Sequence, residues 1–159
     1  MSKICVISVG KLKSAHWQEA AKDYITRLRR VWQISEITLR DGDAALSPEQ
    51  RSQEEGIRIL NALNTGQPNE QIVICLDEQG KDLTSLQFAN FLSDCFVNRA
   101  RYPCFVIGGA YGLDAEVKGK ASHCLRLSAM TFTHELAQVV LWEQLYRAQS
   151  ILNGSPYHH

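Results

Sequence analysis

The sequence lacks the features that mark membrane-bound or exported proteins. Its apolar runs fall well short of the roughly 20 residues that a helix needs to span a bilayer. The opening segment, MSKICVISVGKLK, has neither the long apolar region nor the small-residue cleavage site of a signal peptide. We therefore expect a cytoplasmic protein that makes no use of a membrane.

Paired cysteines are also missing. The residues Cys5, Cys75, Cys95, Cys104 and Cys124 are well separated, odd in number and never arranged as Cys-x-x-Cys. Four of them fall in apolar, strand-like runs, where a free cysteine behaves as a small hydrophobic residue. The pattern therefore predicts neither a disulfide framework nor a metal site.

An excess of charge of one sign is absent, since 17 Lys and Arg residues balance 17 Asp and Glu residues. Free-standing nucleic-acid-binding domains usually carry a basic excess, so the composition argues against that class. A local basic surface is still compatible with the sequence, because Arg27, Arg29 and Arg30 lie close together and Lys11 and Lys13 precede them. An ordinary solvated face is the simpler interpretation of these five residues.

The common nucleotide-binding and nucleophile signatures do not occur. The segment GGAYG (108–112) matches neither the dinucleotide fingerprint G-x-G-x-x-G nor a phosphate-binding P-loop. No G-x-S-x-G elbow is present either. The glycine segment is thus open to two interpretations, a tight turn or a ligand loop, and its position after a buried strand favours the second.

Strand-like and helical segments alternate along all 159 residues. Strands are expected at 3–10, 32–40, 71–80 and at the starts of 101–114 and 123–132, and helices at 14–30, after Ser47, over Leu86–Phe96, around Lys118 and at 133–152. This alternation predicts one α/β domain, residues 1–159, with a mostly parallel sheet. Ligands bind at the carboxyl ends of such strands, so the loops LDEQGK, IGGAYGLD and LSAMTFTHE are expected to lie together.

Two helices carry further expectations. SPEQ (47–50) forms a capping box with proline at the first helical position, and the polar turns that follow are expected to project into solvent. The last helix is apolar over most of its circumference, which requires cover on several sides and favours a second subunit. On this helix Glu143 and Arg147 are spaced for an ion pair, although Arg147 could instead hold an acidic group.

Six motifs occur in a fixed order: VGKLK, LDEQGK, FVIGGAYGL, LSAMTFTHE, WEQLYRA and the terminal SPYHH. With these motifs the chain resembles the SPOUT-class methyltransferases of bacterial large-subunit ribosomal RNA, which methylate N3 of a pseudouridine. The resemblance spans essentially the whole chain. It implies a homodimer, a SPOUT-type sheet with a deep C-terminal trefoil knot, S-adenosylmethionine as cofactor and ribosomal RNA in the ribosome as substrate.

The resemblance also implies which residues form the site. The cofactor pocket is expected to be lined by Leu76, Gly108, Leu127, Ser128, Ala129, Met130, Thr131 and Phe132, with Gly108 and Gly109 allowing close approach of the ligand. The substrate-facing, catalytic groups are expected to be Arg147, Tyr157, His158 and His134, with the tail acting on the pocket of the partner subunit. Methylation at N3 removes a proton, which requires a base or a cation that stabilises the anion.

Three positions depart from the family pattern. Thr133 stands where proline is expected, Gln138 where arginine is expected, and His159 where another basic residue is expected. These changes remove positive charge near the expected RNA surface, and we therefore expect the assembled ribosome to present the target. Two alternatives stay open: methylation of a transfer RNA nucleoside, and a non-catalytic module that binds the cofactor or the ribosome.

Overall fold

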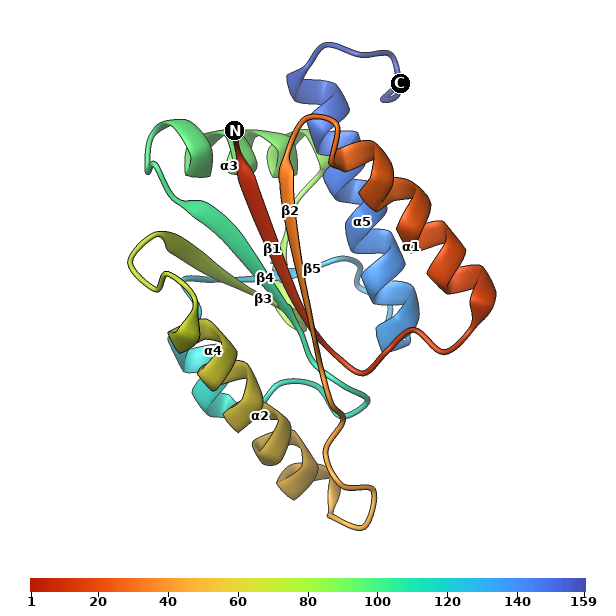
Figure 1. The fold of residues 1–159 in the computed structure, drawn as a ribbon, viewed down its shortest axis with the longest axis vertical. Coiled ribbons are helices and arrows are strands. Elements are labelled where there is room, and N and C mark those ends of the chain that lie inside the picture. The colour runs from red at the N-terminus through yellow and green to blue at the C-terminus, as the bar shows by residue number, and fades with distance from the viewer.

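Five parallel strands form the centre of the computed structural model, which describes all of residues 1–159 (Figure 1). The strands are β1 (Lys3–Val9), β2 (Gln33–Leu39), β3 (Gln71–Asp82), β4 (Tyr102–Ile107) and β5 (His123–Arg126). The helices are α1 (Ala15–Leu28), α2 (Pro48–Thr65), α3 (Ser85–Val97), α4 (Ala115–Lys120) and α5 (His134–Leu152). The strand order is β2-β1-β4-β3-β5, so the predicted α/β architecture with a parallel sheet is confirmed.

The central strands are buried on both faces. This holds for β4 and for nearly all of β1 and the first half of β3, as their uninterrupted apolar runs predict. In the β3–β4 pair Leu76 lies beside Ile107, and in the β3–β5 pair Leu76 lies beside Leu125. The three strands therefore end at the same edge of the sheet, where the candidate loops begin.

The helices form two layers. One hydrophobic cluster joins α1, α3 and α5 to the sheet, and a second cluster joins α2 and α4 to the opposite face (Figure 1). Helix α5 contacts both α1 and α3, and its residues Leu141, Leu145 and Ala148 are fully buried. Its own chain therefore covers one side of α5, while Leu136, Val140 and Tyr146 stay only half-buried, and the second subunit remains a prediction. None of the helices combines the length and the apolar character needed to cross a membrane.

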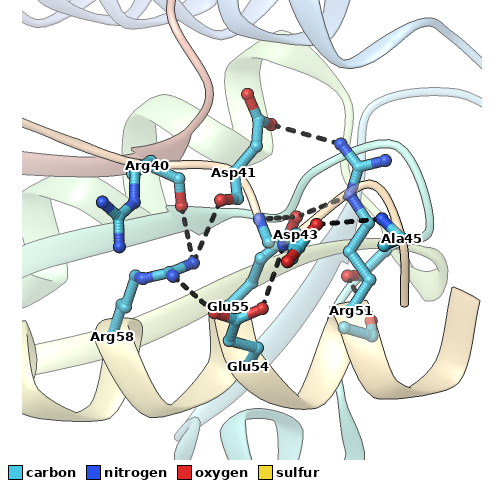
Figure 2. A network of polar contacts seen from close by, with 11 residues as sticks. Arg40, Asp41, Asp43, Ala45, Arg51, Glu54, Glu55 and Arg58 are labelled. Carbon is cyan, nitrogen blue, oxygen red and sulfur yellow. Dashed lines mark hydrogen bonds and ion pairs between the residues drawn. The ribbon is translucent and has the colours of Figure 1, made fainter. Parts of the chain in front are cut away.

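The first turns of α2 differ from the expectation. The capping box is confirmed, since the Gln50 N–H donates to Ser47 Oγ at 3.2 Å and the Ser47 N–H donates to Gln50 Oε1 at 3.3 Å. The prediction that the following turns project into solvent is confirmed for Glu49, Gln50 and Gln53, which are exposed. It is wrong for Ser52, which is buried, and for Glu55, which is only 2% exposed. Glu55 is buried because the segment after β2 lies over α2 and brings backbone N–H groups that need acceptors (Figure 2). Ser52 instead donates to the Gly112 carbonyl of the loop after β4.

The segment 40–45 is held on α2 by charged side chains (Figure 2). The Gly42 N–H donates to Glu55 Oε1, and the Asp43 N–H donates to Glu54 Oε2, both at 3.0 Å. Arg58 Nη1 donates to two backbone carbonyl oxygens of the segment, each at 3.1 Å. Glu55 is the buried member of this network, whereas Glu54 is partly exposed.

Replacing Glu55 and Glu54 separately tests how much of the stability depends on the buried carboxylate. We expect Glu55→Ala to lower the free energy of unfolding by about 2–3 kcal/mol, because it leaves the Gly42 N–H buried without an acceptor. The neighbouring control Glu54→Ala should cost less than about 1 kcal/mol, since its ion pair is solvated. Urea unfolding followed by circular dichroism measures both; equal losses in the two variants would contradict this role for Glu55.

Candidate active site

The three candidate loops line one pocket of about 660 Å³ at the carboxyl edge of the sheet. A volume of this order falls within the roughly 300–1,000 Å³ of small-molecule sites. Of the residues expected at the cofactor and at the mouth of the site, those in the lining are Leu76, Gly108, Leu127, Ser128, Met130, Thr131, Phe132 and His134. Ala129 belongs to the same loop but is not part of the lining.

The glycine loop is shaped by close contacts within the protein. Gly112 adopts a φ of 77°, so the tight-turn interpretation holds for this residue. A Cβ on Gly108 would lie 2.8 Å from the Gly112 carbonyl carbon, and a Cβ on Gly109 would lie 2.7 Å from Glu55 Oε2. Ser52 Oγ donates to the Gly112 carbonyl at 2.9 Å. The structure therefore requires glycine at 108 and 109 for close contacts within the chain, and the expected close approach of a ligand to these residues stays a prediction.

The loop at the end of β3 is tied to the loop after β5. The β3–β5 register shifts between Leu76 and Lys81, and a Cβ on Gly80 would lie 2.4 Å from the Leu125 carbonyl carbon. Thr131 Oγ1 donates to Glu78 Oε2 at 3.0 Å and so links the two loops directly. Glycine at position 80 is therefore required for β5 to lie against the end of β3.

An ion pair that the sequence analysis missed lies in the pocket. Lys118 Nζ on α4 is 2.8 Å from Asp77 Oδ2, and both residues line the pocket. Burial raises the pKa of Asp77, but hydrogen bonds from Lys118 and from the Gln79 N–H outweigh it and hold this pKa below its usual value. The hydrogen bond to Asp77 in turn raises the pKa of Lys118. The sequence did contain a signal for Asp77, because this acid directly follows the buried apolar run of β3, at the edge of the sheet where ligands bind.

The pocket combines free backbone donors with apolar side chains. The backbone N–H groups of Thr131 and Phe132 donate to no atom of the chain, and both residues line the pocket. The side chains of Leu76 and Leu127 lie half-buried in the same lining. Main-chain donors beside apolar surface suit a flat heterocycle with a polar edge, so the pocket fits the adenosyl group of S-adenosylmethionine.

Among the expected catalytic groups, only His134 lies at the pocket. It is the first residue of α5, and Thr133 rather than His134 caps the helix, accepting a hydrogen bond from the Leu136 N–H at 3.3 Å. Arg147 lies 13 residues further along α5. At the helical rise of about 1.5 Å per residue this places it roughly 20 Å from His134.

Arg147, Tyr157 and His158 form a second group, which we call the tail cluster together with Glu143. The predicted ion pair is confirmed, since Arg147 Nη2 lies 2.6 Å from Glu143 Oε1. The Tyr157 hydroxyl donates to the same oxygen at 3.2 Å, and Arg147 Nη1 lies 3.3 Å from His158 Nδ1. The tail thus folds back on the C-terminal half of its own α5 (Figure 1).

Two members of the tail cluster, Tyr157 and Arg147, have raised pKa values. Burial raises the pKa of Tyr157, and hydrogen bonding to Tyr24 and the charge of Glu143 raise it further. The hydrogen bond to Glu143 raises the pKa of Arg147. At neutral pH the cluster therefore offers a phenol donor and a guanidinium cation, both suited to stabilise a developing anion.

Comparison with known proteins agrees with this geometry. The profile of the family described as "Predicted SPOUT methyltransferase" matches residues 2–158. The chain belongs to the SPOUT methyltransferase family. A protein from Oleidesulfovibrio alaskensis named "Ribosomal RNA large subunit methyltransferase H" is 52% identical over 159 residues, covering 100% of both chains. A protein of the same name from Lawsonia intracellularis is 47% identical over 154 residues, covering 97% of this chain and 96% of its own.

A solved structure also resembles this SPOUT methyltransferase. The crystal structure of a putative methylase family protein from Neisseria gonorrhoeae superposes with a TM-score of 0.57 at 14% identity, covering 99% of this chain and 86% of that chain. This likeness supports the SPOUT fold. The C-terminal trefoil knot stays a prediction.

Alanine at Gly109 tests the coupling between α2 and the pocket of this SPOUT methyltransferase. The added Cβ would displace the Glu55 carboxylate, so we expect Gly109→Ala to weaken S-adenosylmethionine binding about tenfold or more by shifting the glycine loop. The control Gly119→Ala has nothing within 4 Å of its Cβ, and it should bind the cofactor like the wild type. Isothermal titration calorimetry measures both affinities; unchanged binding by Gly109→Ala would show that the loop tolerates the shift.

The Asp77–Lys118 pair predicts a pH dependence of stability. Because folding lowers the pKa of Asp77, the carboxylate stabilises the fold above its unfolded pKa of about 4, and this contribution is lost as the pH falls below that value. The difference in free energy of unfolding between wild type and Asp77→Asn should therefore be constant near neutral pH and shrink in acid. Urea unfolding at a series of pH values measures it. A difference that does not vary with pH would refute the role of the ion pair.

Proposed function

We propose that this SPOUT family member methylates large-subunit ribosomal RNA, with S-adenosylmethionine as methyl donor and N3 of a pseudouridine as acceptor. The observation that carries the proposal is the meeting of three sequence motifs in one pocket with free backbone donors. The names of the full-length relatives support ribosomal RNA as the substrate class. We place the reaction in the cytoplasm and assign it to a single domain of residues 1–159.

In this mechanism the chain supplies orientation and charge. S-adenosylmethionine, when bound, supplies an electrophilic methyl group. Leu76 and Leu127 exclude water from the pocket, and the loop that contains Thr131 positions the donor for in-line transfer. Arg147 stabilises the negative charge that develops as N3 releases its proton to solvent water, and Tyr157 donates a hydrogen bond to the same base. His158 and His134 complete the set of groups that face the RNA.

The pocket and the tail cluster require two copies of the chain to work together. Within one chain His134 and Arg147 are roughly 20 Å apart along a rigid helix, too far for both to contact one base. A homodimer removes this difficulty, because the tail of one protomer then reaches the pocket of its partner. The active enzyme is therefore proposed to be a homodimer with two composite sites.

Methyl transfer to separated substrates tests the proposed activity. Incubation with radiolabelled S-adenosylmethionine should label the large-subunit RNA of intact ribosomes more rapidly than protein-free ribosomal RNA. The balanced net charge supports this order, since a chain without a basic excess is expected to gain little sequence-independent affinity for RNA. Label in transfer RNA would instead favour the alternative substrate. Cofactor binding without labelling of any RNA would favour the non-catalytic module.

Mixing two inactive variants tests the composite site. Deleting residues 157–159 removes the tail, and Thr131→Trp fills the pocket, so each variant alone should be inactive while remaining folded. In a random mixture about half of the dimers combine the two chains, and each of these regains one intact site, giving about a quarter of wild-type activity. Methyl transfer to ribosomes after mixing and re-equilibration measures the recovery.

Two controls support the interpretation of this experiment. Circular dichroism and sedimentation should show that both variants keep the fold and the dimer. The tail deletion should still bind S-adenosylmethionine, whereas Thr131→Trp should not. A mixture that stays inactive would place the pocket and its tail in the same protomer, and full activity of the tail deletion would remove the tail from the mechanism.

A further inference from the structure

A second cleft lies beside the first turns of α5, next to the pocket described above. It has a volume of about 320 Å³ and lies between α1, the strands β1 and β2, and α5; we call it the α1 cleft. It shares no residue with the pocket described above. The two are neighbours, however, because His134 and Ala137 line the pocket while Gln138 and Trp142 line the α1 cleft.

Gln138 is a buried polar residue without a partner. It is 6% exposed, and its Nε2 atom is buried and has no hydrogen-bond partner within the chain. The other two buried glutamines differ: Gln149 Nε2 donates to the Leu28 carbonyl at 3.1 Å, and Gln71 Nε2 donates to the Leu63 carbonyl at 2.9 Å. Buried polar groups are almost always paired, so the carboxamide of Gln138 requires a partner from outside the chain.

The rim of the α1 cleft is basic. Lys11, Lys22 and Arg29 line it, against a single carboxylate, Glu36, which pairs with Arg29 at 2.8 Å. Lys11 and Lys22 are exposed and take part in no ion pair. The cleft therefore has a local positive charge on a chain whose formal net charge is zero.

Walls of two kinds complete the cleft. Ile25 and Trp142 are buried apolar residues, while the buried Ser8 contributes a hydroxyl group. An occupant that satisfies all these features has a flat apolar body, hydrogen-bonding groups on its edge and an attached anion. A nucleotide has these properties, and glutamine carboxamides pair with base edges by donating and accepting together. Proteins recognise RNA chiefly through unpaired bases held in this way.

We propose that the α1 cleft binds an unpaired nucleotide of the RNA substrate, with its base at Gln138 and its phosphate at Lys11 and Lys22. The inference rests on the proposed function for the identity of the RNA, and it assigns a second contact beside the methylation pocket. A strand passing over the start of α5 would place one nucleotide in the pocket and another in the α1 cleft.

Free nucleotides test the site without reference to methylation or to a particular RNA. In the dimeric protein, the side-chain amide NMR signals of Gln138 should shift on addition of millimolar concentrations of at least one of UMP, CMP, AMP and GMP. The amide signals of Gln149, which is buried and already paired, serve as the internal control. Absence of a shift at Gln138 with all four nucleotides would overturn the proposal.

Paired substitutions test the role of the carboxamide in RNA binding. Gln138→Leu preserves the size of the side chain, and it should weaken binding to purified ribosomes about tenfold without lowering the thermal midpoint. Its affinity for S-adenosylmethionine should not change. The matched control Gln149→Leu should lower the thermal midpoint, because it leaves the Leu28 carbonyl unpaired, while ribosome affinity is retained.

Charge variants test the position of the phosphate. Lys22→Gln should reduce the slope of log affinity against log salt by about one, whereas the control Lys120→Gln, on the distant α4, should leave it unchanged. Wild-type ribosome affinity in Gln138→Leu would show that the cleft holds only water. Dissociation of the dimer in Gln138→Leu would place the cleft at a subunit contact and also overturn the proposal.

The failure of this proposal is distinguishable from failure of the proposed function. If nucleotides shift the Gln138 signals but no RNA is methylated, the α1 cleft stands and the enzymatic assignment fails. If ribosomes are methylated and no nucleotide reaches Gln138, the enzymatic assignment stands and the cleft proposal fails.

Discussion

The loops that line the pocket are positioned by the pairing of β3 with a strand on each of its sides. β4 lies on one side and ends with Ile107 beside Leu76, and β5 lies on the other with Leu125 beside the same residue. Gly80 then allows the end of β3 to pass against Leu125 at a distance that no side chain tolerates. The loops that follow all three strands are therefore placed by contacts of a single strand, and displacing β5 would move the loop of residues 127–132 with it.

Helix α2 supports the glycine loop of the pocket from the face of the sheet opposite to α1, α3 and α5. Ser52 holds the Gly112 carbonyl, and Glu55 holds the Gly42 N–H while its second oxygen lies against Gly109. Polar residues on one face of α2 thus connect the segment after β2 to the glycine loop after β4. Burying a carboxylate is costly unless it is paired, and Arg51 Nε at 3.5 Å from Glu55 Oε1 supplies the compensating charge.

Much of the fold follows from local patterns in the sequence, and the exceptions arise from contacts between distant residues. Apolar runs and helical spacing predicted the alternating elements, and the parallel sheet follows from that alternation. The burial of Glu55 was not predictable, because the start of α2 has the polar composition of a solvated helix and becomes buried only when the segment 40–45 folds over it. The lining of the pocket was foreseen from loop position and family motifs, whereas the Asp77–Lys118 pair depends on how α4 packs. The residue types of the tail, and its action on the pocket of another subunit, were implied by the family resemblance, whereas the contacts of Tyr157 and His158 with Glu143 and Arg147 depend on how the tail folds back on α5.

The length of helix α5 keeps the candidate pocket and the α1 cleft apart from the tail cluster. Its 19 residues span roughly 28 Å, with the pocket and the α1 cleft at the first turns and the tail cluster at the last. Three buried side-chain atoms of the chain lack a hydrogen-bond partner: Arg51 Nε, Glu55 Oε2 and Gln138 Nε2. The first two belong to residues that compensate each other by charge, which leaves Gln138 as the one polar group whose burial the chain does not itself offset. Because Gln138 lies one turn from His134, whatever satisfies it lies beside the candidate pocket, where we propose that the RNA strand passes.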